Sequence, residues 1–250
     1  MISLLNQRVL ITGGSRGIGR AAAILFARAG ADVMISYQSR EADARATVAD
    51  IEWLGRKAFA FKGDLSDPVV VDGLFAACES KLGGLDCFVG NAGIWPVEDV
   101  PLKNMDPARW RKTMGANLDA IFLTTRAALK MLPEGGRIVL VGSTAGQRGE
   151  SMHADYAATK GAMISLVKSL AIECAPGITV NCVAPGWVDT EMSGTAFANG
   201  GKERIAKTIP LQRVPPAEDI AGPILFLCSP LARHITGEIL NVNGGSVLCG

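Results

Sequence analysis

The stretch that decides the fold is residues 8–19, RVLITGGSRGIG. Its opening, Arg8–Thr12, is a run of apolar and β-branched residues that predicts a buried strand, and the Ala- and Ile-rich stretch Gly17–Gly30 predicts a helix. Between them, glycines allow positive φ and let the backbone approach a pyrophosphate, whose charge a helix N-terminus favours. The spacing G-x-x-x-G-x-G departs from the common G-x-G-x-x-G, so an ordinary strand-to-helix turn is the alternative. The order strand, glycine-rich turn, helix favours a nucleotide-binding site.

The alternation of strand and helix continues along the chain. The uninterrupted apolar run RIVLVG at 137–142 is typical of a strand that is buried on both faces of a sheet. Further strands are predicted over Asp32–Tyr37, Lys57–Lys62, Leu85–Gly90, Ile178–Val183 and Glu238–Val242, and further helices over Glu41–Leu54, Pro107–Leu132, Ala154–Cys174 and Glu218–Cys228, with another opened by Asp67-Pro68. Repeated βα units predict an α/β fold: a mostly parallel sheet with helices on both faces, in one domain over residues 1–250.

The segment of about residues 189–211 breaks this alternation. It has two consecutive glycines at 200–201, mixed charges and only a weak periodic pattern. We expect a flexible insertion beside the substrate site, because long connections without regular structure are commonly functional.

Composition excludes several classes of protein. Hydrophobic residues make up 48% of the 250 residues and charged residues 20%, so the chain can bury a sizeable core and is not disordered. The formal net charge of +1 gives no broad field that would attract nucleic acid or an anionic membrane. Six cysteines without a C-x-x-C pair or a histidine cluster predict neither a disulfide framework nor a metal site. We find no signal peptide or membrane span and expect a cytoplasmic protein.

The residues after the second predicted strand bear on which dinucleotide binds. NAD sites commonly place an acidic residue here on the ribose hydroxyls, but the chain reads Ser36-Tyr37-Gln38-Ser39-Arg40, with no acid before Glu41. The missing carboxylate removes the repulsion that a 2′-phosphate would feel, and Arg16, Arg40 and Ser39 offer two cations and a hydroxyl. We therefore expect NADP(H) to be preferred over NAD(H). The alternative for Arg40 is a solvated residue at a helix start.

Tyr156 and Lys160 stand four residues apart in a predicted helix, which puts both on one face. A free tyrosine has a pKa of about 10, and a nearby ammonium or a positively charged nicotinamide ring lowers it. Tyr156 could then donate or accept a proton near neutral pH. Tyr37 and Tyr156 are the two tyrosines of the chain, so the pairing does not follow from abundance. Spacing alone nevertheless favours an exposed Tyr and Lys on a helix.

Two further polar residues are candidates for the same site. Ser143 follows the RIVLVG strand at the carboxyl edge of the sheet, where open α/β sheets bind ligands, and its hydroxyl could hold a substrate oxygen. The alternatives are an ordinary polar residue at a strand end, or the same role for Thr144. Asn117 lies within the predicted helix Pro107–Leu132, where a buried amide needs partners. A water chain toward Lys160 and a satisfied core position are the two interpretations.

In combination these motifs resemble the classical short-chain dehydrogenase/reductase family over residues 6–246, nearly the whole chain. The motifs that carry the resemblance are TGGSRGIG at 12–19, Asp64-Leu65, Asn91-Ala92-Gly93, Asn117, Ser143, YAATK at 156–160, and Pro185-Gly186 followed by Thr190. The resemblance implies a single Rossmann-type, doubly wound domain with a seven-stranded parallel sheet, and commonly a homotetramer. It also implies a catalytic tetrad of Asn117, Ser143, Tyr156 and Lys160.

The family pattern implies cofactor roles position by position. Asp64 would bond the adenine amino group, Asn91 would stabilise the sheet edge near the cofactor ribose, and Lys160 would hold the nicotinamide ribose hydroxyls. The residues expected to line the nicotinamide are Pro185, Gly186, Val188 and Thr190. The full predicted cofactor-binding set is Gly13, Ser15, Arg16, Gly17, Ile18, Gly19, Tyr37, Ser39, Arg40, Asp64, Leu65, Asn91, Ala92, Gly93, Tyr156, Lys160, Pro185, Gly186, Val188 and Thr190.

Within the family the chain resembles bacterial acyl-carrier-protein ketoreductases and related carbonyl reductases. The stretches Glu134-Gly135-Gly136 and Ala175-Pro176-Gly177 lack the basic residues that would meet an acidic carrier protein. We therefore expect a small-molecule substrate, a fairly apolar ketone or secondary alcohol, with 3-oxoacyl-acyl-carrier-protein reduction as the alternative. Residues that could form an apolar pocket, or could instead pack or contact another subunit, are Trp95, Met152, His153, Trp187, Met192 and Phe197.

Two other classes of function stay open. The intact tetrad argues against a catalytically silent, NADP(H)-binding regulator. No G-x-S-x-G surrounds Ser143 and no His/Asp pair is placed by the sequence, which argues against a serine hydrolase. His153 and His234 show no partner arrangement typical of a triad or a metal site, and we expect both at the solvent or a subunit interface.

Overall fold

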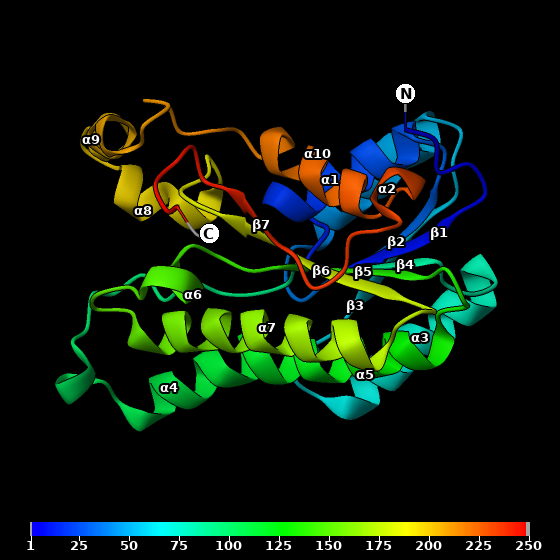
Figure 1. Cartoon of the computed structure of the whole chain (residues 1–250), viewed down its shortest axis with the longest axis horizontal. Coiled ribbons are helices and arrows are strands. Elements are labelled where there is room, and N and C mark those ends of the chain that lie inside the picture. The colour runs from blue at the N-terminus through cyan, green and yellow to red at the C-terminus, as the bar shows by residue number, and fades with distance from the viewer. Residues whose placement is uncertain (1, 249–250) are drawn as a thin grey trace.

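The computed structural model describes residues 2–248, which fold around one parallel sheet (Figure 1). The strands are β1 (Arg8–Ile11), β2 (Asp32–Tyr37), β3 (Ala58–Lys62), β4 (Cys87–Gly90), β5 (Arg137–Val141), β6 (Thr179–Pro185) and β7 (Ile239–Val242). Their order in the sheet is β3-β2-β1-β4-β5-β6-β7, and every neighbouring pair is parallel. The predicted seven-stranded, doubly wound sheet is confirmed. The winding reverses between β1 and β4, where sheets of this kind bind ligands.

Helices cover the two faces of the sheet in separate layers (Figure 1). One layer has α1 (Gly17–Arg28), α2 (Glu41–Trp53) and α10 (Glu218–Leu227), and the other has α3 (Pro68–Leu82), α4 (Pro107–Met114), α5 (Ala120–Met131) and α7 (Ala154–Glu173). Successive side chains of a strand point to opposite faces. Val9 therefore packs in the core that contains Phe26 of α1, whereas Leu10 packs in the core that contains Leu74 of α3. Strands that serve two cores have to be apolar at nearly every position.

The start of α3 follows its sequence signal. The Asp67 carboxylate accepts the backbone N–H of Val69 at 2.9 Å, and Pro68 takes the first helical position, which needs no N–H. This confirms the predicted N-cap and brings the loop between β3 and α3, which holds Asp64 and Leu65, to the carboxyl edge of the sheet.

The helix predicted over residues 107–132 is divided. Between α4 and α5, Gly115–Asp119 form a π-helical turn, in which the Ala120 N–H bonds to the carbonyl of Gly115. The turn carries the buried Asn117. Apolar spacing does not reveal such a turn, because one extra residue changes the phase of the pattern but not its composition.

The segment 189–211 contains regular turns rather than an irregular loop. Its elements are η3 (Glu191–Ser193), α8 (Gly194–Phe197) and α9 (Gly201–Thr208). An ion pair between Lys202 and Asp189 ties α9 to the end of the preceding loop. The predicted flexibility of this segment stays a prediction. The remaining short elements are η1 (Leu102–Asn104), α6 (Ala145–Arg148) and η4 (Pro230–Ala232).

Residues 2–248 have no helix that combines the length and the apolarity needed to cross a membrane. In the same part of the chain, no three His, Cys, Asp or Glu side chains are grouped so that they could hold a metal ion. The thiols of Cys78, Cys87, Cys174, Cys182 and Cys228 are free. Cys249 lies outside the described residues.

Candidate active site

Two cavities adjoin at the carboxyl edge of the sheet. We call them the glycine cavity, which begins at the turn after β1, and the tyrosine cavity, which contains Tyr156. Both share part of their walls: Ile18, Asn91, Gly93, Thr190 and Met192 line each of them. Apart from Gly19 and Asn117, every predicted cofactor-binding or catalytic residue lines one of the two cavities. The structure thus brings the predicted site residues together.

The turn after β1 is shaped by glycines at positions where a Cβ would be strained or would clash. Gly13 and Gly17 have φ of 67° and 54°, a region that side chains with a Cβ rarely adopt. Gly19 is a packing position instead, because a Cβ there would lie 2.3 Å from the carbonyl oxygen of Gly13. The Thr12 hydroxyl accepts the backbone N–H of Asn91 at 2.9 Å and so joins the turn to the end of β4.

The glycine cavity fits the phosphates of a dinucleotide. Arg16 precedes α1 without capping it, and its N-terminal amides face a cavity with Gly13, Ser15 and Gly17 in its wall. Uncapped helix amides are donors for an anion. Asp64 lies further along the same cavity, where its carboxylate accepts the amide N–H of Gln38 at 3.0 Å. The residues present therefore suit a long ligand with phosphates at one end of α1.

The two predicted cations of the glycine cavity are not free. Arg16 and Arg40 both donate to the same Oε2 atom of Glu191, Arg40 at a distance of 3.0 Å. Glu191 opens η3 and is a residue that the sequence interpretation missed. Its acidic side chain comes from the segment 189–211, and nothing in the local sequence indicated that it would meet the arginines. The sequence did not indicate this pairing, and the expectation that the two arginines meet a 2′-phosphate stays a prediction.

In the tyrosine cavity, Ser143 and Tyr156 line the same wall, and the Ser143 hydroxyl is close enough to act on the pKa of the phenol. Burial raises the pKa of Tyr156 to about 12; the Ser143 hydrogen bond lowers it by less, and the Glu150 charge raises it. Ser143 also accepts the backbone N–H of Ala145 at 3.1 Å, which fixes the orientation of its hydroxyl. Thr144 is buried beside it and lines the same cavity, but Ser143 is the hydroxyl that acts on the pKa of the phenol.

Lys160 lies one helical turn from Tyr156 on α7 and is 5% exposed. Its ammonium donates to the carbonyl oxygen of Val141 at 2.8 Å and sits 5.7 Å from the centre of the Tyr156 ring. Burial lowers the pKa of Lys160 to about 8. We expected this ammonium to lower the pKa of Tyr156, but burial raises that pKa instead. At neutral pH both groups hold their protons.

Asn117 is held by the segment that follows β4. Its side-chain oxygen accepts the N–H of Ile94 at 2.7 Å, and its amide donates to the carbonyl of Ile94 at 2.9 Å and to the Thr159 hydroxyl at 3.4 Å. Of the two interpretations, the satisfied side chain is the one observed. A Cβ on Gly93 would lie 3.1 Å from the Asn117 oxygen, so glycine leaves room for this contact.

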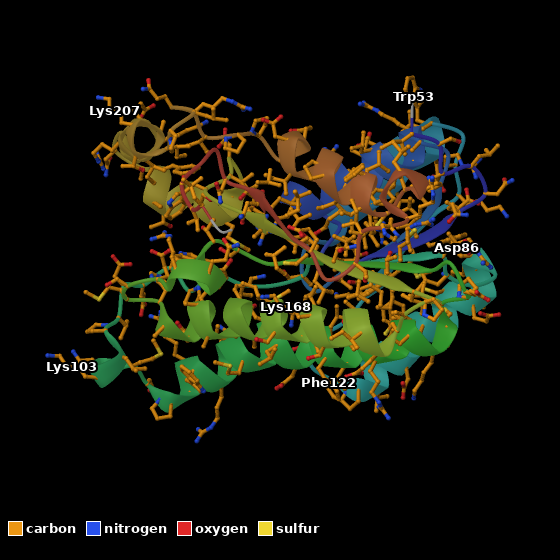
Figure 2. All side chains as sticks on the ribbon, viewed as in Figure 1. Trp53, Asp86, Lys103, Phe122, Lys168 and Lys207 are labelled. Carbon is orange, nitrogen blue, oxygen red and sulfur yellow. The ribbon has the colours of Figure 1, made fainter. Side chains whose placement is uncertain are left out.

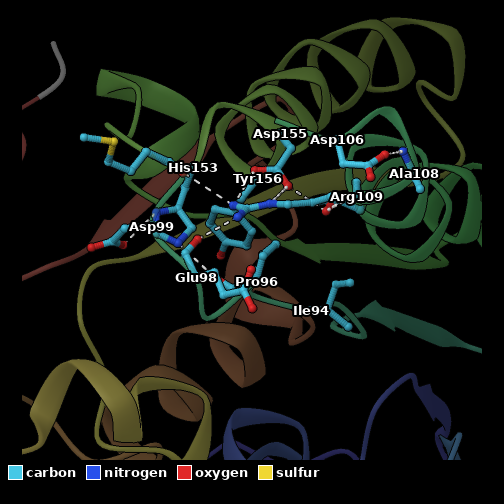
Figure 3. Close-up of polar contacts among 12 residues, drawn as sticks. Ile94, Pro96, Glu98, Asp99, Asp106, Ala108, Arg109, His153, Asp155 and Tyr156 are labelled. Carbon is cyan, nitrogen blue, oxygen red and sulfur yellow. Dashed lines mark hydrogen bonds and ion pairs between the residues drawn. The ribbon is translucent and has the colours of Figure 1, made fainter. Parts of the chain in front are cut away.

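A buried ion pair next to Tyr156 joins the walls of the tyrosine cavity (Figure 3). The Asp155 carboxylate is fully buried and accepts from Arg109 at 3.1 Å and from the Thr113 hydroxyl at 2.8 Å. Burial would raise the pKa of Asp155, but hydrogen bonds from Arg109, Thr113 and the Tyr156 N–H outweigh it and hold the pKa below its usual value. Arg109 also donates to the carbonyl of Glu98 at 2.6 Å. The guanidinium thereby ties the loop after β4 to the start of α7.

His153 corrects a second prediction. We expected it at the solvent or a subunit interface, but it is 4% exposed and stacks on Trp95 with 3.9 Å between ring centres. Its Nε2 lies 2.8 Å from the carbonyl oxygen of Pro96, which can only accept (Figure 3). His153 therefore packs behind Trp95 and supports the loop that carries it.

Aromatic rings form one wall of the tyrosine cavity. Trp95 meets the Tyr156 ring edge-on at 4.7 Å between centres, Trp187 follows at 6.1 Å from Trp95, and Phe197 lies 5.9 Å from Trp187. Trp95 and Trp187 line the cavity, so both the pocket and the packing interpretations hold for them. The charged side chains of the lining besides Lys160 are Arg148 and Glu150, which pair at 2.7 Å. The cavity thus suits a neutral, largely apolar substrate.

Comparison with known proteins places the chain among relatives of similar length. The family model described as enoyl-(acyl carrier protein) reductase matches residues 13–246. A 3-oxoacyl-[acyl-carrier-protein] reductase of Synechocystis sp. is 38% identical over 252 residues, covering 99% of this chain and 100% of that protein. An L-rhamnose 1-dehydrogenase (NAD(P)(+)) of Sphingomonas sp. is 40% identical over 250 residues, covering 97% of this chain and 96% of that protein.

Solved structures agree over the same extent. A short-chain dehydrogenase from Burkholderia cenocepacia in complex with NADP is 38% identical, with a TM-score of 0.91 over 97% of this chain and 98% of that one. A short-chain dehydrogenase/reductase from Brucella melitensis is 35% identical, with a TM-score of 0.92 over 99% of each chain.

Proposed function

The chain belongs to the short-chain dehydrogenase/reductase family of oxidoreductases that act on alcohol and carbonyl groups, and we propose that it transfers a hydride between NADP(H) and a ketone or secondary alcohol. Tyr156 is the general acid and base of this reaction. The observation that carries the proposal is that Ser143, Tyr156 and Lys160 line one cavity, which shares part of its wall with the glycine cavity.

The chemistry is divided between the cofactor and the protein. A bound nicotinamide supplies or accepts the hydride. Ser143 and Tyr156 line one cavity, and in the proposed reaction a carbonyl oxygen bound between their hydroxyls accepts a hydrogen bond from each. As negative charge develops on that oxygen, Ser143 stabilises it and Tyr156 transfers its proton. In the opposite direction Tyr156 takes up the proton of the alcohol.

The protonation states favour Tyr156 as a proton donor at neutral pH. Its pKa of about 12 keeps the phenol protonated, as reduction of a carbonyl requires. Lys160, with a pKa of about 8, is still charged and can pass a proton toward the phenol. An Asn117-held water is the proposed link to solvent; because the side chain of Asn117 already bonds Ile94, the main chain of the π turn is the part left to bind this water.

We propose NADP(H) as the preferred dinucleotide. Support comes from the absence of a carboxylate at the end of β2, where the cavity is lined by Tyr37, Ser39 and Arg40, and from Arg16 in the turn. A relative with 38% identity is in complex with NADP, whereas the name of another relative includes both dinucleotides.

The proposed substrate is a neutral, fairly apolar carbonyl compound, which the aromatic wall and the Arg148–Glu150 pair support. The second candidate is reduction of a 3-oxoacyl group on an acyl-carrier protein, favoured by a relative of that name that the chain matches over 99% of its length. A carrier protein is acidic, and the pairing of Arg148 with Glu150 removes a cation that could meet it.

Assembly and location are proposals as well. The family resemblance suggests a homotetramer with α5 and α7 at one interface. Phe122 on α5, labelled in Figure 2, is 54% exposed. Ile172 on α7 is 82% exposed, and an interface would cover such side chains. The proposed compartment is the cytoplasm.

The test is a set of ketones, secondary alcohols and acetoacetyl thioesters assayed in both directions. Oxidation of NADPH, followed by its absorbance, with apolar ketones as the best substrates is the expected result. Ester cleavage without any dinucleotide would contradict the proposal. Activity confined to the carrier-protein thioester would favour the second candidate.

A further inference from the structure

Glu191 links three segments that are far apart in the sequence. It opens η3, a turn whose residues line both cavities, and its Oε2 atom accepts from Arg16 of the glycine turn and from Arg40, the residue before α2. Arg40 has a second, longer contact of 3.9 Å with Asp43. A single carboxylate oxygen therefore takes hydrogen bonds from two guanidinium groups in the wall of the glycine cavity.

Two guanidinium groups converging on one point form a site for an anion with more charge and more acceptor atoms than a carboxylate. If NADP(H) binds as proposed, its 2′-phosphate needs these same cations. NAD(H) has a hydroxyl in that position and has no comparable need. Glu191 should therefore weaken the binding of NADP(H) and leave the binding of NAD(H) unchanged.

We propose that Glu191 is a specificity-determining residue, which competes with the 2′-phosphate of NADP(H) for Arg16 and Arg40 and so limits the preference for NADP(H) over NAD(H). The inference rests on the proposed function, because it assumes that a dinucleotide occupies the glycine cavity. It concerns affinity for the dinucleotide and is independent of the identity of the carbonyl substrate.

The exposure of the three side chains makes this competition reversible. The side chains of Arg16, Arg40 and Glu191 are 48%, 51% and 57% exposed, so water screens their pairing. A phosphate monoester carries a charge of about −1.5 to −2 and three acceptor oxygens, and it can displace a carboxylate of charge −1. NADP(H) then binds more weakly than the two arginines alone would allow, whereas NAD(H) binds with the Glu191 contacts intact.

The test compares dinucleotide affinity in three forms of the full chain: wild type, Glu191→Gln and Glu203→Gln. Gln keeps the shape of the side chain and removes its charge. Glu203 is an exposed residue of α9 and is not among the carboxylates paired with Arg16 or Arg40, so its variant has the same net charge without the contact. The dissociation constants of NADPH and NADH are measured by calorimetry at low ionic strength, where exposed charges interact most strongly.

We expect Glu191→Gln to lower the Kd of NADPH by about threefold to tenfold and to leave that of NADH within about twofold. In Arg40→Ala/Glu191→Gln, compared with Arg40→Ala, the gain should shrink because one of the two cations is gone. An unchanged ratio of the two Kd values in Glu191→Gln overturns the inference, and so does an equal effect of Glu203→Gln. A wild-type chain that binds neither dinucleotide overturns the proposed function itself, a result that is distinguishable from the first two.

Discussion

The two cavities at the carboxyl edge are built by different means. The glycine cavity is formed by main chain at the winding reversal: positive φ at Gly13 and Gly17, and the uncapped amides of α1. Three of its charged side chains, Arg16, Arg40 and Glu191, are about half exposed. The tyrosine cavity is formed by side chains from separate loops, with Tyr156 and Lys160 buried and their pKa values moved to about 12 and about 8.

This difference indicates that the glycine cavity should determine binding and the tyrosine cavity should determine chemistry. A site made of backbone amides and solvent-exposed charges can hold a charged ligand. A site made of buried titratable groups shifts proton affinities, because burial penalises charge. Substitutions in the tyrosine cavity should therefore change rates, and substitutions in the glycine cavity should change affinity for the dinucleotide.

The largest effect is expected from Tyr156→Phe. Removal of the hydroxyl takes away the proton donor but leaves the ring against Trp95, so kcat should fall by about 10³-fold or more. The Kd of NADPH, measured by fluorescence titration, should stay within about twofold of the wild-type value. Turnover at the wild-type rate would refute the catalytic role, and a large loss of NADPH affinity would break the separation of the two cavities.

Arg109→Met tests whether the tyrosine cavity depends on its buried ion pair. The substitution leaves the carboxylate of Asp155 buried without its cation, and the free energy of unfolding should fall by about 3–5 kcal/mol. Because the pKa of Asp155 is lowered in the folded chain, the contribution of this pair is present at neutral pH and is lost as the pH falls below about 4.

The matched control for that variant is an ion pair at the surface. Arg45 pairs with Glu41 at 2.5 Å but its side chain is 79% exposed. Urea denaturation of Arg45→Met should show a loss of less than about 0.5 kcal/mol. Equal losses in the free energy of unfolding would mean that the Arg109–Asp155 pair stabilises the fold no more than a surface pair does.

Gly19→Ala tests whether the glycine cavity depends on the close packing of its turn. The added Cβ would lie 2.3 Å from the Gly13 carbonyl oxygen and 2.6 Å from the Asn91 amide, so the turn has to move. We expect a loss of about 1–3 kcal/mol in stability and a Kd for NADPH raised by about tenfold. In Gly222→Ala, within α10, the Cβ meets nothing within 4 Å, and its stability should stay equal or rise.

The pH dependence of carbonyl reduction is the smallest effect that we expect, because activity should hardly change near neutral pH. Burial lowers the pKa of Lys160 to about 8, so its ammonium is lost as the pH rises above that value, while Tyr156 keeps its proton until about 12. The kcat/KM for carbonyl reduction should be flat from about pH 6 to 8 and then fall by up to about tenfold per pH unit. Circular dichroism over the same range checks that the chain stays folded. A flat profile to about pH 10 would exclude Lys160 from proton supply.

The contrast also explains what the sequence could predict. The glycine turn, the strand pattern and the Tyr–Lys spacing are local, and the sheet and the lining of both cavities follow from them together with the family resemblance. The missed features join distant residues: Arg109 meets Asp155 across 46 positions, and Glu191 meets Arg16 across 175. His153 was misplaced for the same reason, because its burial depends on a stacking partner, Trp95, from another loop.

The π turn at residues 115–119 has a consequence for insertions and deletions in this chain. One added residue advances a helix by about 100° around its axis, so α4 and α5 are rotated relative to a single uninterrupted spiral. Each half can then present its own face: α4 offers Arg109 to the start of α7, and α5 sends Ile121 into the core beneath β4. Removing one residue from the turn would rotate α4 relative to α5, so that the contact of Arg109 with α7 and the burial of Ile121 could not both be kept.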